Sequence, residues 1–107
     1  MNELDISRML LMFEQSVRQI NKEEINPKIP ELKLKDLHPV IQLVARARAK
    51  YLKELMNIAN ITESDQLPSP EQIKRLDDLH NTYQSLLNGS KAVEIAIDRG
   101  YLDVEID

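Results

Sequence analysis

The chain has 107 residues and a net charge of −4, and only 4% of its residues are aromatic. This length suits one domain with a modest core, which must be built from aliphatic side chains and methionine. Such a composition favours helices over a β-sandwich. The absence of cysteine excludes disulfides, thiolate metal sites and cysteine nucleophiles. The negative charge also argues against general binding to nucleic-acid phosphates.

The N-terminal sequence lacks the basic region and the apolar run of a signal peptide, and no apolar stretch reaches the ~18 residues of a membrane-spanning helix. We therefore expect a single helical domain over residues 1–107 that makes no membrane contact. Together with the absence of cysteine, these features predict a soluble protein of the cytoplasm.

A first helix is predicted over residues 3 to about 23, with Asn2 as its N-cap. Its apolar residues recur at spacings of four and three, the pattern of a helix that packs against other helices. These residues are Ile6, Leu10, Phe13, Val17 and Ile20. Met9, Leu11 and Met12 widen the apolar surface, so the helix either lies centrally in the fold or offers a second face to a partner.

Proline residues separate the first helix from the second. Pro27 and Pro30 end helical structure, because proline lacks an amide donor and favours an extended conformation in the residue before it. A second helix is expected to begin at His38-Pro39, since proline suits the first helical turn, and to end near Asn60.

Two further helices are predicted in the C-terminal half of the chain. Ser69 and Gln72 form the pattern of a capping box, which begins a third helix. Gly89 is expected to end this helix, and Ser90 to cap a short fourth helix that ends at Gly100. The predicted fold is therefore all-α, a four-helix bundle-like arrangement with three long helices and one short one.

Two short segments alternate apolar and charged residues with the period of a β-strand. Residues 32–35 alternate leucine with lysine, and residues 102–107 form an extended acidic tail. A two-stranded pairing of residues 32–35 with residues 102–106 would set lysines beside carboxylates. The alternative is an irregular loop and a frayed C-terminus, in which case the tail could add a strand to another protein's sheet.

Arg48 is predicted to lie in the middle of the apolar face of the second helix, about 40° from Val44 and Leu52. Because a buried guanidinium needs a partner, we expect Arg48 to lay its methylenes on apolar neighbours and to pair with a carboxylate. The alternative is that it binds an anionic ligand or an acidic side chain of a partner protein. The candidate acids for an internal pair are Glu14, Asp77 and Glu94.

His80 falls on the inner face of the third helix, where a lone histidine is usually a hydrogen-bonded core residue. Asp77 precedes it by three residues, a spacing found in metal-binding helical bundles, but those bundles need a second element of this kind. The sequence also lacks phosphate-binding glycine loops and known catalytic motifs. We therefore expect no catalytic residue, no metal site and no cofactor.

The favoured interpretation is a non-enzymatic helical protein that acts by protein–protein interaction, such as a regulatory subunit, an inhibitor or immunity-type protein, or an assembly chaperone. We also expect it to form a homodimer, because a chain of this size buries limited area alone. Methionine is common at adaptable binding surfaces. The residues predicted to contact a partner are Met9, Met12, Arg46, Arg48, Lys50, Lys53, Leu102, Val104 and Ile106.

Two other functions remain open from the sequence. A nucleic-acid-binding regulator would use the basic stripe of the second helix, formed by Arg46, Lys50 and Lys53, to contact phosphates. A small helical enzyme or ligand-binding bundle would place its site around Arg48 and His80. The charge balance of the predicted fourth helix argues against the first alternative, and nothing in the residue spacing requires the second.

Overall fold

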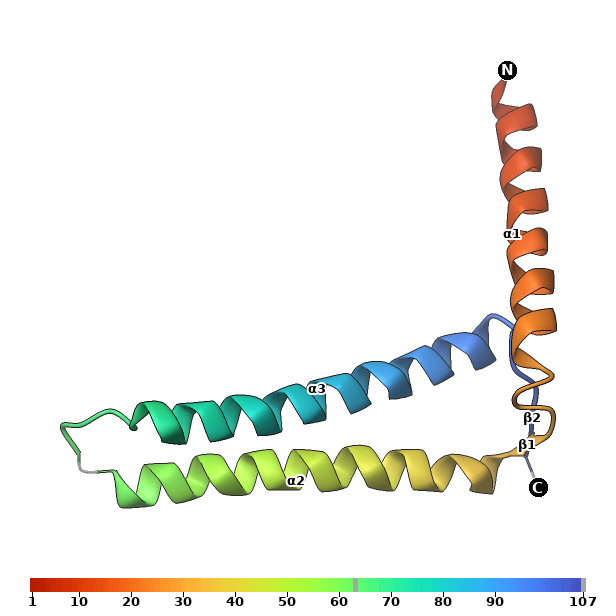
Figure 1. Ribbon diagram of the computed structural model, residues 1–107. Helices are drawn as coiled ribbons and strands as arrows, with labels where there is room; N and C mark the ends of the chain where they lie inside the picture. The colour runs from red at the N-terminus through yellow and green to blue at the C-terminus, as the bar shows by residue number, and fades with distance from the viewer. Residues whose placement is uncertain (63, 107) are drawn as a thin grey trace. The chain divides into compact units, whose positions relative to one another are not determined.

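A computed structural model describes residues 1–62 and 64–106 and shows a chain that is 76% helical (Figure 1). Its elements are α1 (Glu3–Ile25), β1 (Leu32–Lys33), the short 3-10 helix η1 (Leu34–Leu37), α2 (His38–Ile61), α3 (Pro70–Asp98) and β2 (Val104–Glu105). None of the helices in the described part of the chain combines the length and the apolar character needed to cross a membrane.

The described residues form three α-helices, and the predicted four-helix bundle is therefore not what the structure shows. The prediction failed at Gly89, because α3 continues through this residue to Asp98. A glycine inside a helix costs only about 1 kcal/mol relative to alanine, which is too little by itself to end a long helix. Asn88 helps to continue the helix, since its side-chain oxygen accepts a hydrogen bond from Gln84 Nε2 (3.1 Å).

The helix ends confirm most of the local predictions. Asn2 caps α1 by accepting a hydrogen bond from the amide of Asp5 (2.9 Å). The capping box of α3 is complete, because the amide of Ser69 donates to Gln72 Oε1 (2.7 Å) and the amide of Gln72 donates to Ser69 Oγ (3.2 Å). Gly100 lies just beyond α3 with a φ of 75°, a left-handed conformation that glycine adopts without strain.

The chain divides into two compact units, of which the first combines residues 1–36 with the C-terminal part from residue 93. Here β1 and β2 pair in parallel, with Leu32 opposite Val104 and Lys33 opposite Glu105 (Figure 1). This confirms the predicted pairing of the basic and acidic segments, although residues 34 and 35 belong to η1 instead. The neighbouring Leu102 is 4% exposed, so it is a core residue of the chain.

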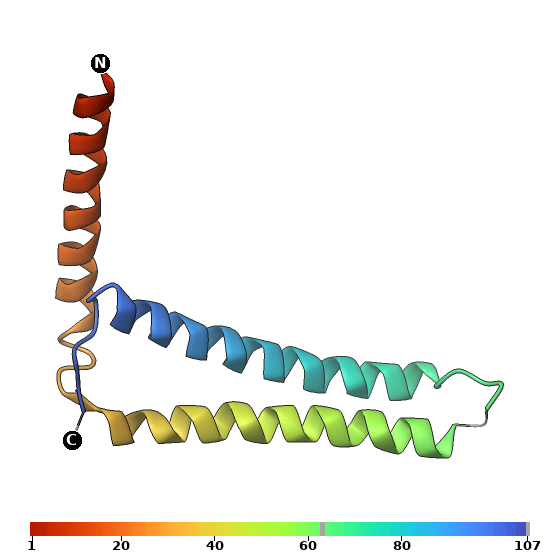
Figure 2. The same ribbon diagram turned by 180° about the vertical axis from the view of Figure 1, so that it is seen from behind.

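The second unit, residues 37–92, is a helical hairpin. In both views α2 and the matching part of α3 lie side by side and run in opposite directions (Figure 2). Three side chains of α2 are buried in this unit: Val44, Ala47 and Ile58. They lie on one side of α2, since residues 44, 47 and 58 fall within an arc of about 60° on a helix that turns about 100° per residue.

Candidate functional site

A row of exposed apolar side chains runs along α1. It consists of Ile6, Met9, Leu10, Phe13, Val17 and Ile20, which we call the α1 stripe. These six residues fall within an arc of about 100° on the helix. Val17 is half-buried, and the other five side chains are between 46% and 64% exposed. Single exposed apolar residues are ordinary, but a contiguous row of this kind marks an interaction surface.

The structure explains why the α1 stripe is exposed. No residue of α1 is buried, and every residue from 1 to 16 is exposed. The polar contacts that tie α1 to the C-terminal segment lie in its second half: Arg18 Nε donates to the carbonyl of Arg99 (3.1 Å), and Lys22 Nζ pairs with Asp103 (3.2 Å). The first four turns of α1 therefore carry no buried side chain.

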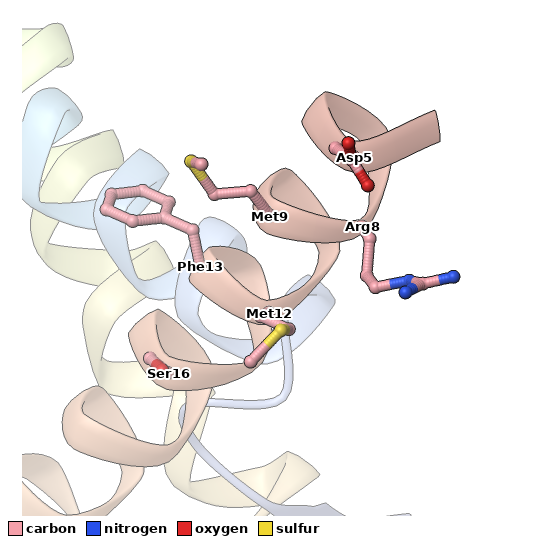
Figure 3. Close-up of a pocket in the computed structure, with 6 residues that line it drawn as sticks. All are labelled: Asp5, Arg8, Met9, Met12, Phe13 and Ser16. Atoms are coloured by element: carbon pink, nitrogen blue, oxygen red, sulfur yellow. The ribbon is translucent and has the colours of Figure 1, made fainter. Parts of the chain in front are cut away.

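A shallow hollow on α1 lies at the edge of the α1 stripe (Figure 3). Met9 and Phe13 project to one side of the helix, and Arg8 projects to the other. Because all the lining residues belong to one helix, the hollow is a gap between side chains and not an enclosed ligand cavity. Only Met9 and Phe13 of its lining belong to the α1 stripe, so the gap lies at the edge of the stripe and extends away from it. The lining residues are Asp5, Arg8, Met9, Met12, Phe13 and Ser16.

Carboxylates border the α1 stripe on both sides. Glu3 and Glu14 lie along one border, and Asp5 and Glu23 lie along the other, each about 20–40° from the nearest apolar residue. The three cations of α1 are centred on the opposite side of the helix; they are Arg8, Arg18 and Lys22. The α1 stripe is thus an apolar surface with acidic edges, which favours a partner with basic edges. Placing the residues on a helical wheel would have revealed these edges from the sequence.

A second exposed apolar surface lies on α2, next to the buried side that carries Val44, Ala47 and Ile58. Its large side chains are between 42% and 60% exposed. We call it the α2 face; it consists of Ile41, Ala45, Leu52, Leu55 and Met56. Arg46 and Lys53 are both exposed and lie outside this face, about 60–80° beyond Met56 on the helix.

Arg48 lies within the α2 face and is exposed rather than buried. Its Nε donates a hydrogen bond to Tyr83 Oη (3.0 Å), and its Cζ lies 5.3 Å from the centre of the Tyr83 ring. The predicted carboxylate partner is not seen, since no acid among the described residues forms an ion pair with Arg48. An exposed guanidinium keeps its hydration, so a phenol oxygen is a sufficient partner and no buried acid is needed.

His80 is also exposed, and it contacts Tyr51 with a distance of 5.3 Å between the ring centres. Tyr51 in turn stacks on Tyr83 at 6.1 Å. The structure therefore brings Arg48, Tyr51, His80 and Tyr83 together between α2 and α3. This cluster contains no carboxylate, and the described residues include no group of three or more side chains that could hold a metal ion.

The remaining residues predicted to contact a partner fall into two groups. Met12 and Lys50 are exposed, but Met12 lies outside the α1 stripe and Lys50 lies on the side of α2 away from the α2 face. In the C-terminal segment, Leu102 is buried and Val104 is half-buried opposite Leu32 in the strand pair. Ile106 alone of these three tail residues exposes its side chain, at 85%.

The chain matches no protein-family model, no curated protein and no solved structure. The exposed surfaces of the chain itself are therefore the basis for inferring its function. The α1 stripe and the α2 face are the two surfaces on which exposed apolar side chains gather in a helical row.

Proposed function

We propose that the protein is a non-enzymatic helical protein that acts by binding a protein partner through the α1 stripe. The observation that carries this proposal is the row of five apolar side chains, each about half exposed, along one side of a capped helix. A solvent-exposed helix gains no stability from packing, and isolated helices are only marginally stable in water. A partner that covers the α1 stripe would supply the missing packing.

The size of the α1 stripe sets the strength of this contact. Fully burying a Leu, Ile, Phe or Met side chain contributes about 1.5–3 kcal/mol, so a half-exposed one contributes about 1 kcal/mol when it is covered. The five exposed side chains together contribute about 5 kcal/mol, which is near the lower end of the roughly 4–15 kcal/mol that association costs. The α1 stripe alone therefore gives weak binding, and its acidic borders must add to specificity or affinity.

A crosslinking experiment tests the proposal. A photoreactive phenylalanine analogue at position 13 would place the crosslinker on the α1 stripe, and the same analogue at position 15 would place it about 160° away on the helix. Both positions are exposed, so the second variant is a matched control. We expect protein adducts from position 13 in living cells and few from position 15. No adduct from position 13, or equal yields of the same adducts from both positions, would contradict the proposal.

A further inference from the structure

We infer that α2 binds duplex DNA through a row of cations on the side opposite α3. The row consists of Arg46, Lys50 and Lys53, which we call the α2 basic stripe. It lies on a different helix and in a different unit from the α1 stripe, so this second binding activity does not depend on the proposed function. It follows from the residues on this side of α2, from their place in the hairpin and from the distribution of charge along the chain.

The side of α2 that carries the α2 basic stripe has no acid. Its three cations fall within an arc of about 60° on the helix. Between residues 42 and 60, a wider arc of about 100° adds only alanine and amide side chains, all of them exposed. These added residues are Gln42, Ala49, Asn57 and Asn60.

The other helix of the hairpin packs against the opposite side of α2. Glu54 of α2 pairs with Arg75 of α3. Arg48 and Tyr51 of α2 both contact Tyr83 of α3. These three positions of α2 are centred about 130° from the centre of the α2 basic stripe. α3 therefore does not cover the stripe.

The three cations of the α2 basic stripe are free to bind an anion. None of them forms an ion pair with a residue in the described part of the chain. Glu54 is the only acid of α2 and lies four residues after Lys50, but its carboxylate pairs with Arg75 (3.1 Å between Oε2 and Nε). A phosphate would therefore meet no competing carboxylate on this side of the helix.

The net negative charge of the protein belongs to the other unit. Residues 37–92 contain seven lysines and arginines against six acids, whereas the rest of the chain contains seven against twelve. The net charge of −4 is thus a weaker argument against DNA binding by the hairpin than it is for the chain as a whole. The charge balance of the predicted fourth helix is no longer an argument either, because α3 continues through that segment.

Duplex DNA suits this side of α2 better than other anionic partners do. The major groove of B-DNA admits an α-helix, whereas the major groove of duplex RNA is too deep and narrow for side chains to read. Arginine and lysine contact phosphates and guanine, and asparagine and glutamine contact adenine, so the polar residues here are of the types that contact DNA. An anionic membrane favours large apolar side chains beside the cations, and this arc has only Ala49.

Neutralising the cations tests the inference. The stripe variant carries Arg46→Gln, Lys50→Gln and Lys53→Gln. The matched control removes the same charge at exposed positions elsewhere, by Lys28→Gln, Lys35→Gln and Lys91→Gln. Fluorescence anisotropy would measure binding to a short labelled DNA duplex of random sequence between about 50 and 200 mM salt. Duplex RNA, phosphatidylserine vesicles and polyglutamate would be tested as competitors, and circular dichroism would check that each variant is folded.

We expect wild-type protein to bind the DNA duplex with a Kd of about 1–100 μM at the lowest salt concentration. The logarithm of the binding constant should fall with the logarithm of the salt concentration with a slope of about −2.7, since each of three neutralised phosphates contributes about −0.9. The stripe variant should bind at least about tenfold more weakly, and the control should bind like wild type. The single variant Lys53→Gln should reduce the size of the slope by about one, which gives a second test if the triple variant fails to fold.

Three results would overturn the inference: wild-type protein that does not bind DNA at the lowest salt concentration, a stripe variant that binds like wild type, or equal losses in the stripe variant and the control. Competition by RNA, vesicles or polyglutamate that is as strong as competition by unlabelled DNA would also overturn it, because the stripe would then bind another class of anion. The α1 stripe is unchanged in all these variants, so none of these results affects the adducts expected from position 13.

Discussion

At the scale of single residues, Arg48 shows how an arginine fits into an apolar helix face. It lies among apolar residues on the helix surface, and its exposed guanidinium donates to Tyr83. The sequence indicated the position correctly but not the partner, because helical spacing places a residue on a face without showing how deeply that face is covered.

The hydrogen bond from Arg48 to Tyr83 should make a small contribution to stability. We expect Tyr83→Phe to lower the free energy of unfolding by about 0.5–1.5 kcal/mol, the usual net value of one hydrogen bond. Urea unfolding of Tyr83→Phe, Arg48→Met and the double variant would measure the coupling between the two side chains. Strictly additive losses would show that the two side chains do not interact.

The capping box of α3 should make a contribution of similar size. Ser69→Ala removes the hydroxyl that accepts from the amide of Gln72, and we expect it to cost about 1 kcal/mol of unfolding free energy. Ser85→Ala is the matched control, because Ser85 is exposed in the interior of the same helix. Equal effects of the two substitutions on the urea midpoint would argue against the capping role.

At the scale of elements, the two glycines show that a glycine late in a predicted helix ends the helix at one position and not at the other. Both follow a polar residue late in a predicted helix, yet α3 continues through Gly89 and ends before Gly100. The difference comes from the surroundings of the two glycines. Gly100 precedes the segment that pairs with β1, and a β-carbon at Gly100 would lie 3.7 Å from Arg18 Cδ. Tertiary contacts of this kind leave no mark in the local sequence.

Alanine substitutions at the two glycines should have opposite effects. Gly89 is helical and a β-carbon there would meet no atom within 4 Å, so Gly89→Ala should stabilise the protein by about 0.5–1 kcal/mol. At Gly100 the φ of 75° strains any L-residue, so Gly100→Ala should destabilise it by about 1–2 kcal/mol. Thermal and urea unfolding would measure both, and a loss of stability in Gly89→Ala would contradict the continuous helix.

The sequence predicted helix ends, the strand pairing and the apolar row of α1, because caps, alternation and helical spacing are local features. It did not predict the number of helices or the acidic borders of the α1 stripe, and it left open whether α1 is central or offers a face to a partner. Periodicity identifies an apolar face, but the burial of that face depends on what packs against it. The tail residues show the same limit, since Leu102 was assigned to a partner and is buried in its own chain.

At the scale of the whole molecule, the α1 stripe and the α2 face are the features that a function must explain. Only four apolar residues in the described part of the chain are buried, whereas both surfaces expose rows of large apolar side chains. A chain that leaves this much apolar surface uncovered is stabilised by whatever covers it. We therefore expect its free energy of unfolding to rise with protein or partner concentration.

The central claim, that protein covers the α1 stripe in the working state, is tested most directly by oxidation of two methionines. Met9 lies on the stripe and Met12 lies outside it, and their side chains are 52% and 60% exposed in the single chain. Hydroxyl-radical labelling followed by mass spectrometry would compare their oxidation in dilute purified protein and in living cells. We predict similar rates in the dilute protein and clearly slower oxidation of Met9 than of Met12 in cells. Equal oxidation of the two in cells would contradict the account.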